Sequence, residues 1–361
     1  MARIYNFSAG PSTLPLPVLE EIQNDLLDYK GVGLSIIEMS HRSKDYSEVH
    51  QEAKNLLHEV FGIPKNYKII FCTGGASMQF AMIPMNFLHQ GSCDYIDTGA
   101  WSAKAIKEAK IQGKAHRVAG SSKDTNYNYI PSQDQLDLDP NARFVHITTN
   151  NTIFGTQYKN LPDTGGVPLV CDMSSDILSK KMDFDSIGMI YAGAQKNMGP
   201  AGVTVAAIRE DMLENLAEGL PSLLTYKTFV NKDSLFNTPP CFAIYTIKLV
   251  LEWIKKVGGM ETIQKWNEEK GDLLYGMMEK YSEFYNGTTE KESRSLMNVT
   301  LRLPNVELEK IFIADATKAG FGGLKGHRSV GGIRVSMYNA MPVEGVKKLT
   351  EFMDDFRKKN S

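Results

Sequence analysis

Apolar residues recur along the chain with two different spacings, which separate helices from strands. Near the N-terminus, apolar positions at helical spacing predict two helices, over residues 18–26 and 46–60. From about residue 68, short β-branched or apolar runs take over. They predict strands at residues 68–72, 95–97, 143–148, 167–172, 187–192 and 202–208. Because these runs are apolar on both faces and most leave room for crossover helices, we expect a buried parallel or mixed sheet.

The second half of the chain begins with a long apolar helix, expected over residues 240–259 and ended by a glycine pair. Beyond it the pattern predicts an α+β unit. Its elements are helix 260–283, strand 296–303, helix 306–319, strand 332–338 and helix 342–358. A chain of 361 residues exceeds the size at which a single core stops growing. We therefore expect a large domain, residues 16–258, and a small domain, residues 1–15 and 259–361.

The composition is that of an ordinary globular protein, with 42% hydrophobic and 23% charged residues. The 40 basic and 42 acidic residues give a formal net charge of −2, which argues against nucleic acid or an anionic membrane as the main partner. The 4 cysteines are widely spaced and lack the pattern of a zinc site, so we expect reduced thiols and no metal. The N-terminus has no apolar stretch of signal-peptide length and no run approaches the length of a membrane span, so we expect a cytoplasmic protein.

A glycine pair follows the first predicted strand, in the sequence TGGAS at residues 73–77. Between a strand and a helix, Gly74 and Gly75 would let backbone N–H groups and the positive end of the helix dipole face an anion. Ser77 could add a hydroxyl donor. The pair predicts a phosphate-binding turn, and the alternative is a tight connection without a ligand.

Two further residues stand where chemistry is expected. Asp172 ends the predicted strand at 167–172, and ligands of α/β sheets bind beyond the carboxyl ends of the strands; the alternative is a helix N-cap. Lys196 lies in GAQKNMGPAG, residues 193–202, between two apolar strands. An enclosed lysine there would have the lowered pKa that imine chemistry needs, whereas a solvated loop lysine would not. A phosphate turn, a carboxylate and a lysine together are what a pyridoxal-phosphate site requires.

Arginines provide the expected contacts to a substrate. The motif His-Arg-Ser occurs twice, at residues 41–43 and 327–329, and Arg334 lies six residues beyond Arg328. Guanidinium groups pair bidentately with carboxylate or phosphate, so in a chain of net charge −2 these arginines predict a small substrate with two anionic ends. Each arginine could instead belong to a surface ion pair.

Eight strings, spread over the whole chain, together resemble one known family. They are YNFSAGPSTLP (5–15), EMSHRSKDY (38–46), FCTGGASMQF (71–80), DTGAWS (97–102), CDMSSD (171–176), YAGAQKNMGPAG (191–202), FNTPP (236–240) and GHRSVGGIRVSMYNA (326–340). On these strings the chain is similar to the phosphoserine aminotransferase family, in class V of the fold-type I pyridoxal-phosphate enzymes. The resemblance implies an α/β fold. Its large domain would have a mostly parallel seven-stranded sheet flanked by helices, and its smaller C-terminal domain would be α+β.

The resemblance also implies the site residues. Lys196 would bind the cofactor, pyridoxal 5′-phosphate, and move the substrate proton, Asp172 would pair with the pyridine nitrogen, and Trp101, on an AWS turn, would stack on the ring. The other implied cofactor contacts are Ala76, Ser77, Thr152, Gln195, Asn237 and Thr238, the last two reaching the neighbouring subunit of a homodimer. The implied substrate contacts are His41, Arg42, His327 and Arg328 for a phosphate or side-chain carboxylate, and Arg334 for the α-carboxylate.

By the same resemblance, the enzyme would transfer the amino group of L-glutamate to 3-phosphohydroxypyruvate. The products would be O-phospho-L-serine and 2-oxoglutarate, formed by a ping-pong route in serine biosynthesis. The phosphorylated keto acid of vitamin B6 biosynthesis is a second expected substrate. The chain departs from many relatives at Asn150–Asn151 and at Ala76–Ser77, which affects the detail of the phosphate contacts.

Three other functions fit the sequence less well. A nicotinamide dehydrogenase would need a G-x-G-x-x-G turn after a strand, which the sequence lacks. A cysteine desulfurase would need a mobile cysteine, whereas the only cysteine after Lys196 is Cys241, at the head of an apolar helix. A non-catalytic protein that binds a phosphorylated metabolite would need the phosphate turn and the arginines but neither Lys196 nor Asp172.

Overall fold

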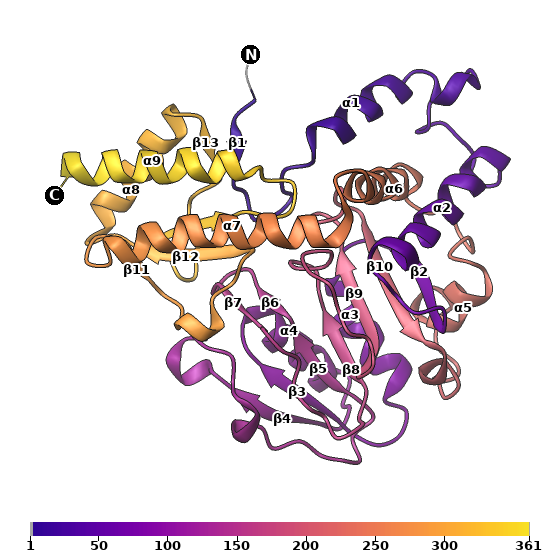
Figure 1. Ribbon diagram of the computed structural model, residues 1–361. Helices are drawn as coiled ribbons and strands as arrows, with labels where there is room; N and C mark the ends of the chain where they lie inside the picture. The colour runs from indigo at the N-terminus through magenta and orange to yellow at the C-terminus, as the bar shows by residue number, and fades with distance from the viewer. Residues whose placement is uncertain (1–2, 361) are drawn as a thin grey trace.

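A seven-stranded sheet forms the centre of the larger part of the protein (Figure 1). The computed structural model describes residues 3–360. The strand order is β2-β10-β9-β8-β5-β3-β4. The bounds are β2 Tyr67–Thr73, β3 Cys93–Asp97, β4 His116–Ser121, β5 Val145–Thr148, β8 Leu169–Asp172, β9 Ile187–Gly193 and β10 Val203–Arg209. The pairs from β9 to β4 are parallel, and β10 is antiparallel to both of its neighbours. The expected α/β fold with a mostly parallel sheet is confirmed.

The six strands predicted from the sequence are all present, but β4 is absent from that prediction. β4 lies at the edge of the sheet and pairs only with β3. Part of it meets solvent, and Val118 is 52% exposed. An edge strand does not need apolar residues on both faces, so a rule that finds buried strands misses it.

Helices cover both faces of this sheet (Figure 1). They are α2 Lys44–Val60, α3 Ser77–Phe87, α4 Ala100–Ile111, α5 Tyr226–Asn231 and α6 Cys241–Lys256. The helix α1 Leu16–Asp25 lies farther from the sheet and packs against α6. Successive strand residues point to opposite faces. In β2, Ile69 and Phe71 therefore pack in a core shared with α2 and α6. Ile70 and Cys72 pack in a second core, shared with α3 and α4.

Trp101 lies on a helix, in the first helical turn of α4, and the expectation that it lies on a connecting loop is therefore wrong. The side-chain oxygen of Ser102 accepts hydrogen bonds from the N–H groups of Thr98 at 3.0 Å and Gly99 at 2.9 Å. The same hydroxyl donates to Asp97 at 2.9 Å. These bonds fix the N-terminal end of the helix. Because α4 begins after a glycine rather than after Ser, Thr, Asp or Asn, the sequence carries no strong start signal there.

The C-terminal elements surround a core of their own (Figure 1). They are α7 Gly259–Lys280, β11 Asn286–Gly287, β12 Asn298–Arg302, α8 Val306–Lys318, β13 Phe321–Gly322, β14 Ile333–Ser336 and α9 Val343–Asn360. The N-terminal strand β1, Tyr5–Asn6, pairs in parallel with β13, and Phe7 joins the C-terminal core. On this basis we propose residues 1–15 and 259–361 as the small domain and residues 16–258 as the large domain.

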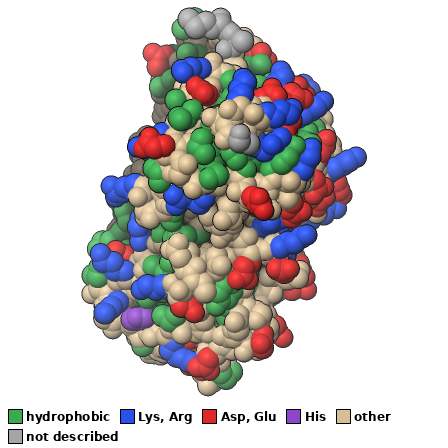
Figure 2. Space-filling model, turned by 90° about the vertical axis from the view of Figure 1, so that its left-hand side faces the viewer, with side chains coloured by type: hydrophobic (Ala, Val, Ile, Leu, Met, Phe, Trp, Pro, Cys, Tyr) green, Lys and Arg blue, Asp and Glu red, His purple; other side chains and the backbone are tan. Residues whose placement is uncertain are grey.

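Within residues 3–360, no helix is both long and apolar enough to cross a membrane. On the face shown in Figure 2, acidic and basic side chains are interspersed over the surface. This mixture agrees with the formal net charge of −2.

Candidate active site

Lys196 lies on the connection between β9 and β10, and the N-terminal segment of the chain packs against that connection. The backbone N–H of Ser12 donates to the carbonyl of Gln195 at 2.9 Å, and the Ser12 hydroxyl donates to the carbonyl of Lys196. Gly10 lies opposite the lysine stem, with a φ of +147°, and a Cβ there would lie 3.2 Å from Cγ of Lys196. Glycine tolerates both this φ and this close approach. The N-terminal segment therefore supports the lysine from one side.

The amine of Lys196 is held by Thr152, whose hydroxyl oxygen accepts a hydrogen bond from Nζ at 2.6 Å. The lysine is partly buried. Burial lowers the pKa of Lys196 to about 8, although the charge of Asp172 acts in the opposite direction. At pH 7 about a tenth of such an amine is unprotonated, compared with about 0.04% of an ordinary lysine. The loop thus encloses the lysine rather than leaving it in solvent.

Asp172, at the end of β8, is 5% exposed. Ser174 donates to its Oδ1 twice, from the backbone N–H at 3.0 Å and from the hydroxyl at 2.6 Å. No donor within the described part of the chain reaches Oδ2. Burial raises the pKa of Asp172, whereas Ser174 and the charge of Lys196 lower it. Because the charges of Asp172 and Lys196 each shift the pKa of the other, the fold brings these two predicted residues to one site.

A second buried carboxylate, Asp176, is absent from the sequence-based set. It accepts hydrogen bonds from the hydroxyl of Thr149 at 2.5 Å and from the side-chain amide of Gln157 at 3.2 Å. Burial raises the pKa of Asp176 to about 6. Its charge, like that of Asp172, raises the pKa of Lys196. The string CDMSSD contains this residue, but only the fold shows that it faces inward.

The glycine pair forms an open turn before α3. Gly74 has a φ of +93°, and a Cβ at Gly74 or at Gly75 would meet no atom within 4 Å. α3 begins at Ser77 without a side-chain N-cap. Among residues 3–360, the N–H groups of Ala76 and Ser77 have no acceptor. Because unpaired N–H groups at a helix N-terminus attract anions, the turn has both the room and the donors for a phosphate.

Two lysine ammonium groups approach the ring of Trp101. Nζ of Lys104 lies 4.3 Å from the ring centroid, and Nζ of Lys196 lies 5.3 Å from it. The indole N–H is buried and has no acceptor among the described residues. Trp101 therefore lies beside the lysine, where a flat ligand could stack on it.

Basic residues from the C-terminal part of the chain complete the cluster. Arg334, on β14, donates to the carbonyl of Thr152 at 3.4 Å. Burial lowers the pKa of His327, and so do the positive charges of three neighbours, Arg334, Arg328 and Lys104. The site therefore has a positive potential suited to an anionic substrate. Lys104 is a basic residue that the sequence analysis missed, because its place beside Trp101 depends on the helix α4.

Four of the predicted residues lie outside this cluster in the single chain. They are His41 and Arg42, before α2, and Asn237 and Thr238, before α6. Within the described residues, none of the four has a hydrogen bond or an ion pair to the group around Lys196. Gln195 does belong to the cluster by position, next to the lysine, and its side chain packs near Gly193.

The sequence pattern of one family, described as aminotransferase class-V, matches residues 4–349. A phosphoserine aminotransferase from Desulfatibacillum aliphaticivorans is 56% identical over 360 residues, which cover 99% of each chain. The chain belongs to the phosphoserine aminotransferases of class V.

Other phosphoserine aminotransferases are similar in sequence and in structure. The protein from Geobacillus kaustophilus is 53% identical over 360 residues, 99% of each chain. The solved structure from Bacillus circulans subsp. alkalophilus matches with a TM-score of 0.97 and 49% identity over 99% of both chains. A structure from Trichomonas vaginalis, described as PLP-bound, matches with a TM-score of 0.93 and 36% identity over 98% of this chain and 100% of that one. The family resemblance seen in the sequence is confirmed.

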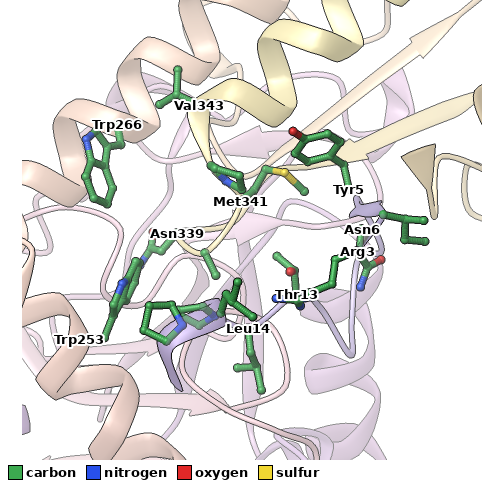
Figure 3. Close-up of a pocket in the computed structure, with 16 residues that line it drawn as sticks. Arg3, Tyr5, Asn6, Thr13, Leu14, Trp253, Trp266, Asn339, Met341 and Val343 are labelled. Atoms are coloured by element: carbon green, nitrogen blue, oxygen red, sulfur yellow. The ribbon is translucent and has the colours of Figure 1, made fainter. Parts of the chain in front are cut away.

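This aminotransferase has a further cavity, of about 560 Å³, which is lined in part by the N-terminal segment (Figure 3). Trp253 and Trp266 line it, with ring centroids 6.4 Å apart. Asn339 lines it too, and its backbone N–H donates to the side chain of Asn197 at 2.9 Å. None of the predicted site residues lines this cavity, so we assign it no part in catalysis.

Proposed function

We propose that this aminotransferase transfers the amino group of L-glutamate to 3-phosphohydroxypyruvate. The products would be O-phospho-L-serine and 2-oxoglutarate, formed by a ping-pong mechanism in serine biosynthesis in the cytoplasm. The observation that carries the proposal is the convergence of Lys196, Asp172 and Arg334 on one site beside further cations. The phosphorylated keto acid of vitamin B6 biosynthesis is proposed as a second substrate.

Pyridoxal 5′-phosphate is the proposed cofactor, because the unpaired groups of the site fit its parts. Oδ2 of Asp172, which has no donor among the described residues, would face the pyridine nitrogen. The open turn at Gly74 and Gly75 would take the phosphate. The full set of proposed contacts is Ala76, Ser77, Trp101, Thr152, Asp172, Gln195, Lys196, Asn237 and Thr238. The bound cofactor supplies an electron sink for the charge that develops at Cα of the substrate.

Lys196 is the proposed proton carrier. With a pKa of about 8, its amine both accepts and releases a proton near neutral pH. In the absence of cofactor, the bond to Thr152 at 2.6 Å sets the direction of the free amine. The buried carboxylate of Asp172 favours positive charge next to it and would keep the nitrogen of a bound pyridine ring protonated.

Different basic residues are proposed to bind different anionic groups of the substrate. We propose that Arg334 binds the α-carboxylate, because its bond to the carbonyl of Thr152 places it beside the amine of Lys196. Arg328 and His327 would bind the phosphate or the side-chain carboxylate. His41 and Arg42 would join them from a second subunit, since they lie apart from the cluster in one chain.

A glutamate-dependent half-reaction assay against a panel of 2-oxo acids tests the proposed function. We expect 3-phosphohydroxypyruvate to be converted with a higher kcat/KM than hydroxypyruvate, pyruvate or oxaloacetate. A preference for one of the unphosphorylated acids would overturn the proposal. A visible absorption band that is lost on borohydride treatment separates this function from that of a non-catalytic metabolite-binding protein.

Replacing Arg328 with alanine should raise KM for 3-phosphohydroxypyruvate by about 10- to 100-fold, because a charge-assisted bond to the phosphate is lost. KM for hydroxypyruvate should change much less. Arg328→Lys, which keeps the charge but not the bidentate geometry, should lie between the two. An equal loss for both acids would remove Arg328 from the phosphate role.

We propose a homodimer with shared active sites. An exposed arm, defined as residues 26–37, follows α1 at the periphery of the molecule (Figure 1). On it, Leu27 is 87%, Leu34 51% and Ile37 58% exposed. Exposed apolar residues gathered on one segment are typical of an interface. The arm leads directly to Arg42. A second copy of the chain that packs on the arm would therefore also have Arg42 close to its own active site.

The double variant Leu27→Glu with Ile37→Glu should shift the protein from dimer to monomer in analytical ultracentrifugation, since two buried charges would destabilise the interface. Activity should fall with the dimer fraction. Ile111→Glu is the matched control, because Ile111 is 65% exposed at the end of α4, away from the arm. A double variant that stays as tightly dimeric as the wild type would contradict the proposed interface.

A further inference from the structure

Lys104 is a basic residue of the site to which the proposed function gives no role. It lies on α4 three residues after Trp101, so the two side chains share one face of the helix. Its Nζ lies 4.3 Å from the centroid of the Trp101 ring, and Nζ of Lys196 lies 5.3 Å from the same centroid. The two ammonium groups are therefore no farther apart than the sum of these distances.

In the described part of the chain, the ammonium group of Lys104 has no anionic partner. Within residues 3–360 it forms no ion pair and no hydrogen bond, and its side chain is exposed. Its charge lowers the pKa of His327, so it lies near the cations proposed for the far end of the substrate. The helix that carries it is fixed at its start by the bonds of Ser102. Lys104 is thus a cation without an ion pair among the described residues, carried by a fixed helix beside Trp101 and near His327.

The two amino-acid substrates of the proposed function differ in charge rather than in length. The side-chain carboxylate carbon of glutamate and the phosphorus of O-phosphoserine are each separated from Cα by the same number of bonds. The carboxylate carries one negative charge, whereas the phosphate carries about 1.5 to 2 at pH 7. A cation near this end of the substrate therefore attracts the phosphate up to about twice as strongly as the carboxylate.

We propose that Lys104 is a specificity-determining residue, whose ammonium group contacts the phosphate and favours the phosphorylated substrate over glutamate. The inference rests on the proposed function and adds a residue to it. The proposed role of Lys104 differs from that of Arg334, because Arg334 would bind the α-carboxylate that both substrates share.

Binding of two unreactive analogues to the holoenzyme tests this role. Isothermal titration with 3-phosphoglycerate and with glutarate compares a phosphate and a carboxylate at the same end. Lys104→Met should raise Kd for 3-phosphoglycerate by about tenfold or more. It should raise Kd for glutarate by no more than about threefold. Lys104→Arg should restore most of the phosphate affinity. Lys107→Met is the matched control, one turn further along α4, and should change neither ligand.

The half-reactions provide a kinetic readout. For Lys104→Met, KM should rise for O-phosphoserine but not for glutamate, with kcat and the cofactor absorption band unchanged. Equal changes for both substrates or both analogues, or no change, would overturn the role of Lys104 while leaving the proposed function intact. A wild-type enzyme that converts glutamate but not O-phosphoserine would overturn the proposed function, and this inference with it.

Discussion

Lys196→Ala should reduce transamination by roughly 10⁴-fold or more, because the variant loses the group proposed to bind the cofactor and move the proton. No other lysine donates to Thr152 in the described part of the chain. Alanine at this position removes the stem that packs against Gly10 but no part of the backbone support from Ser12. The fold should therefore persist, and some cofactor should still bind through the phosphate turn.

The measurement combines kinetics with labelling. Wild-type enzyme treated with borohydride should retain the cofactor covalently at Lys196, as mass spectrometry of the peptides would show, whereas Lys196→Ala should not. Lys265→Ala, an exposed lysine on α7, is the control and should behave like the wild type. Near-normal turnover in Lys196→Ala would refute the assignment of this lysine.

Asp172→Asn should lower kcat by roughly 10³-fold. A carboxylate at about 3.5 Å from a charged nitrogen, with an effective dielectric near 20, stabilises it by about 4 to 5 kcal/mol, or about 3 pKa units. Asparagine keeps an oxygen for the two bonds from Ser174 but loses the charge. The charge of Asp172 raises the pKa of Lys196, so its removal should also lower that pKa below the value of about 8.

Two variants control for burial and for charge. Asp176→Asn removes a carboxylate that is also buried but is bonded to Thr149 and Gln157, and it should cost far less activity. Asp172→Glu keeps the charge and should recover part of the loss. The pH at which apoenzyme reacts with added pyridoxal phosphate reports the pKa of Lys196. If Asp172→Asn and Asp176→Asn lose equal activity, Asp172 has no special relation to the cofactor.

The buried parts of the fold were predictable because burial leaves a direct pattern in the sequence. The strands that end at Asp172 and flank Lys196 are apolar on both faces, and their order along the chain is enough to place both residues near one edge of the sheet. The edge strand β4 and the helix α4 leave weaker patterns, since one is half exposed and the other begins after a glycine.

The remaining parts of the site depend on contacts between distant segments. Lys104 becomes a site residue only when α4 turns it toward Trp101. Asp176 looks like any polar residue of a loop until the fold buries it. Arg42 is a different case. Within a single chain it lies away from the residues with which it is proposed to act, so even the folded chain does not place it in the site. The pattern of residues within one segment does not show which distant segments the fold brings next to it.

The support of Lys196 by the first residues of the chain affects how the enzyme is made. Strand β1 is translated long before its partner β13, which begins at Phe321. The carbonyl of Ala9 is bound by the hydroxyl of Tyr338, which is translated later still. Between the synthesis of Lys196 and that of Tyr338, a nascent chain therefore carries its reactive lysine without the contacts that hold the N-terminal segment in place. Premature termination before this tyrosine should therefore yield inactive protein, even though the whole central sheet is already encoded.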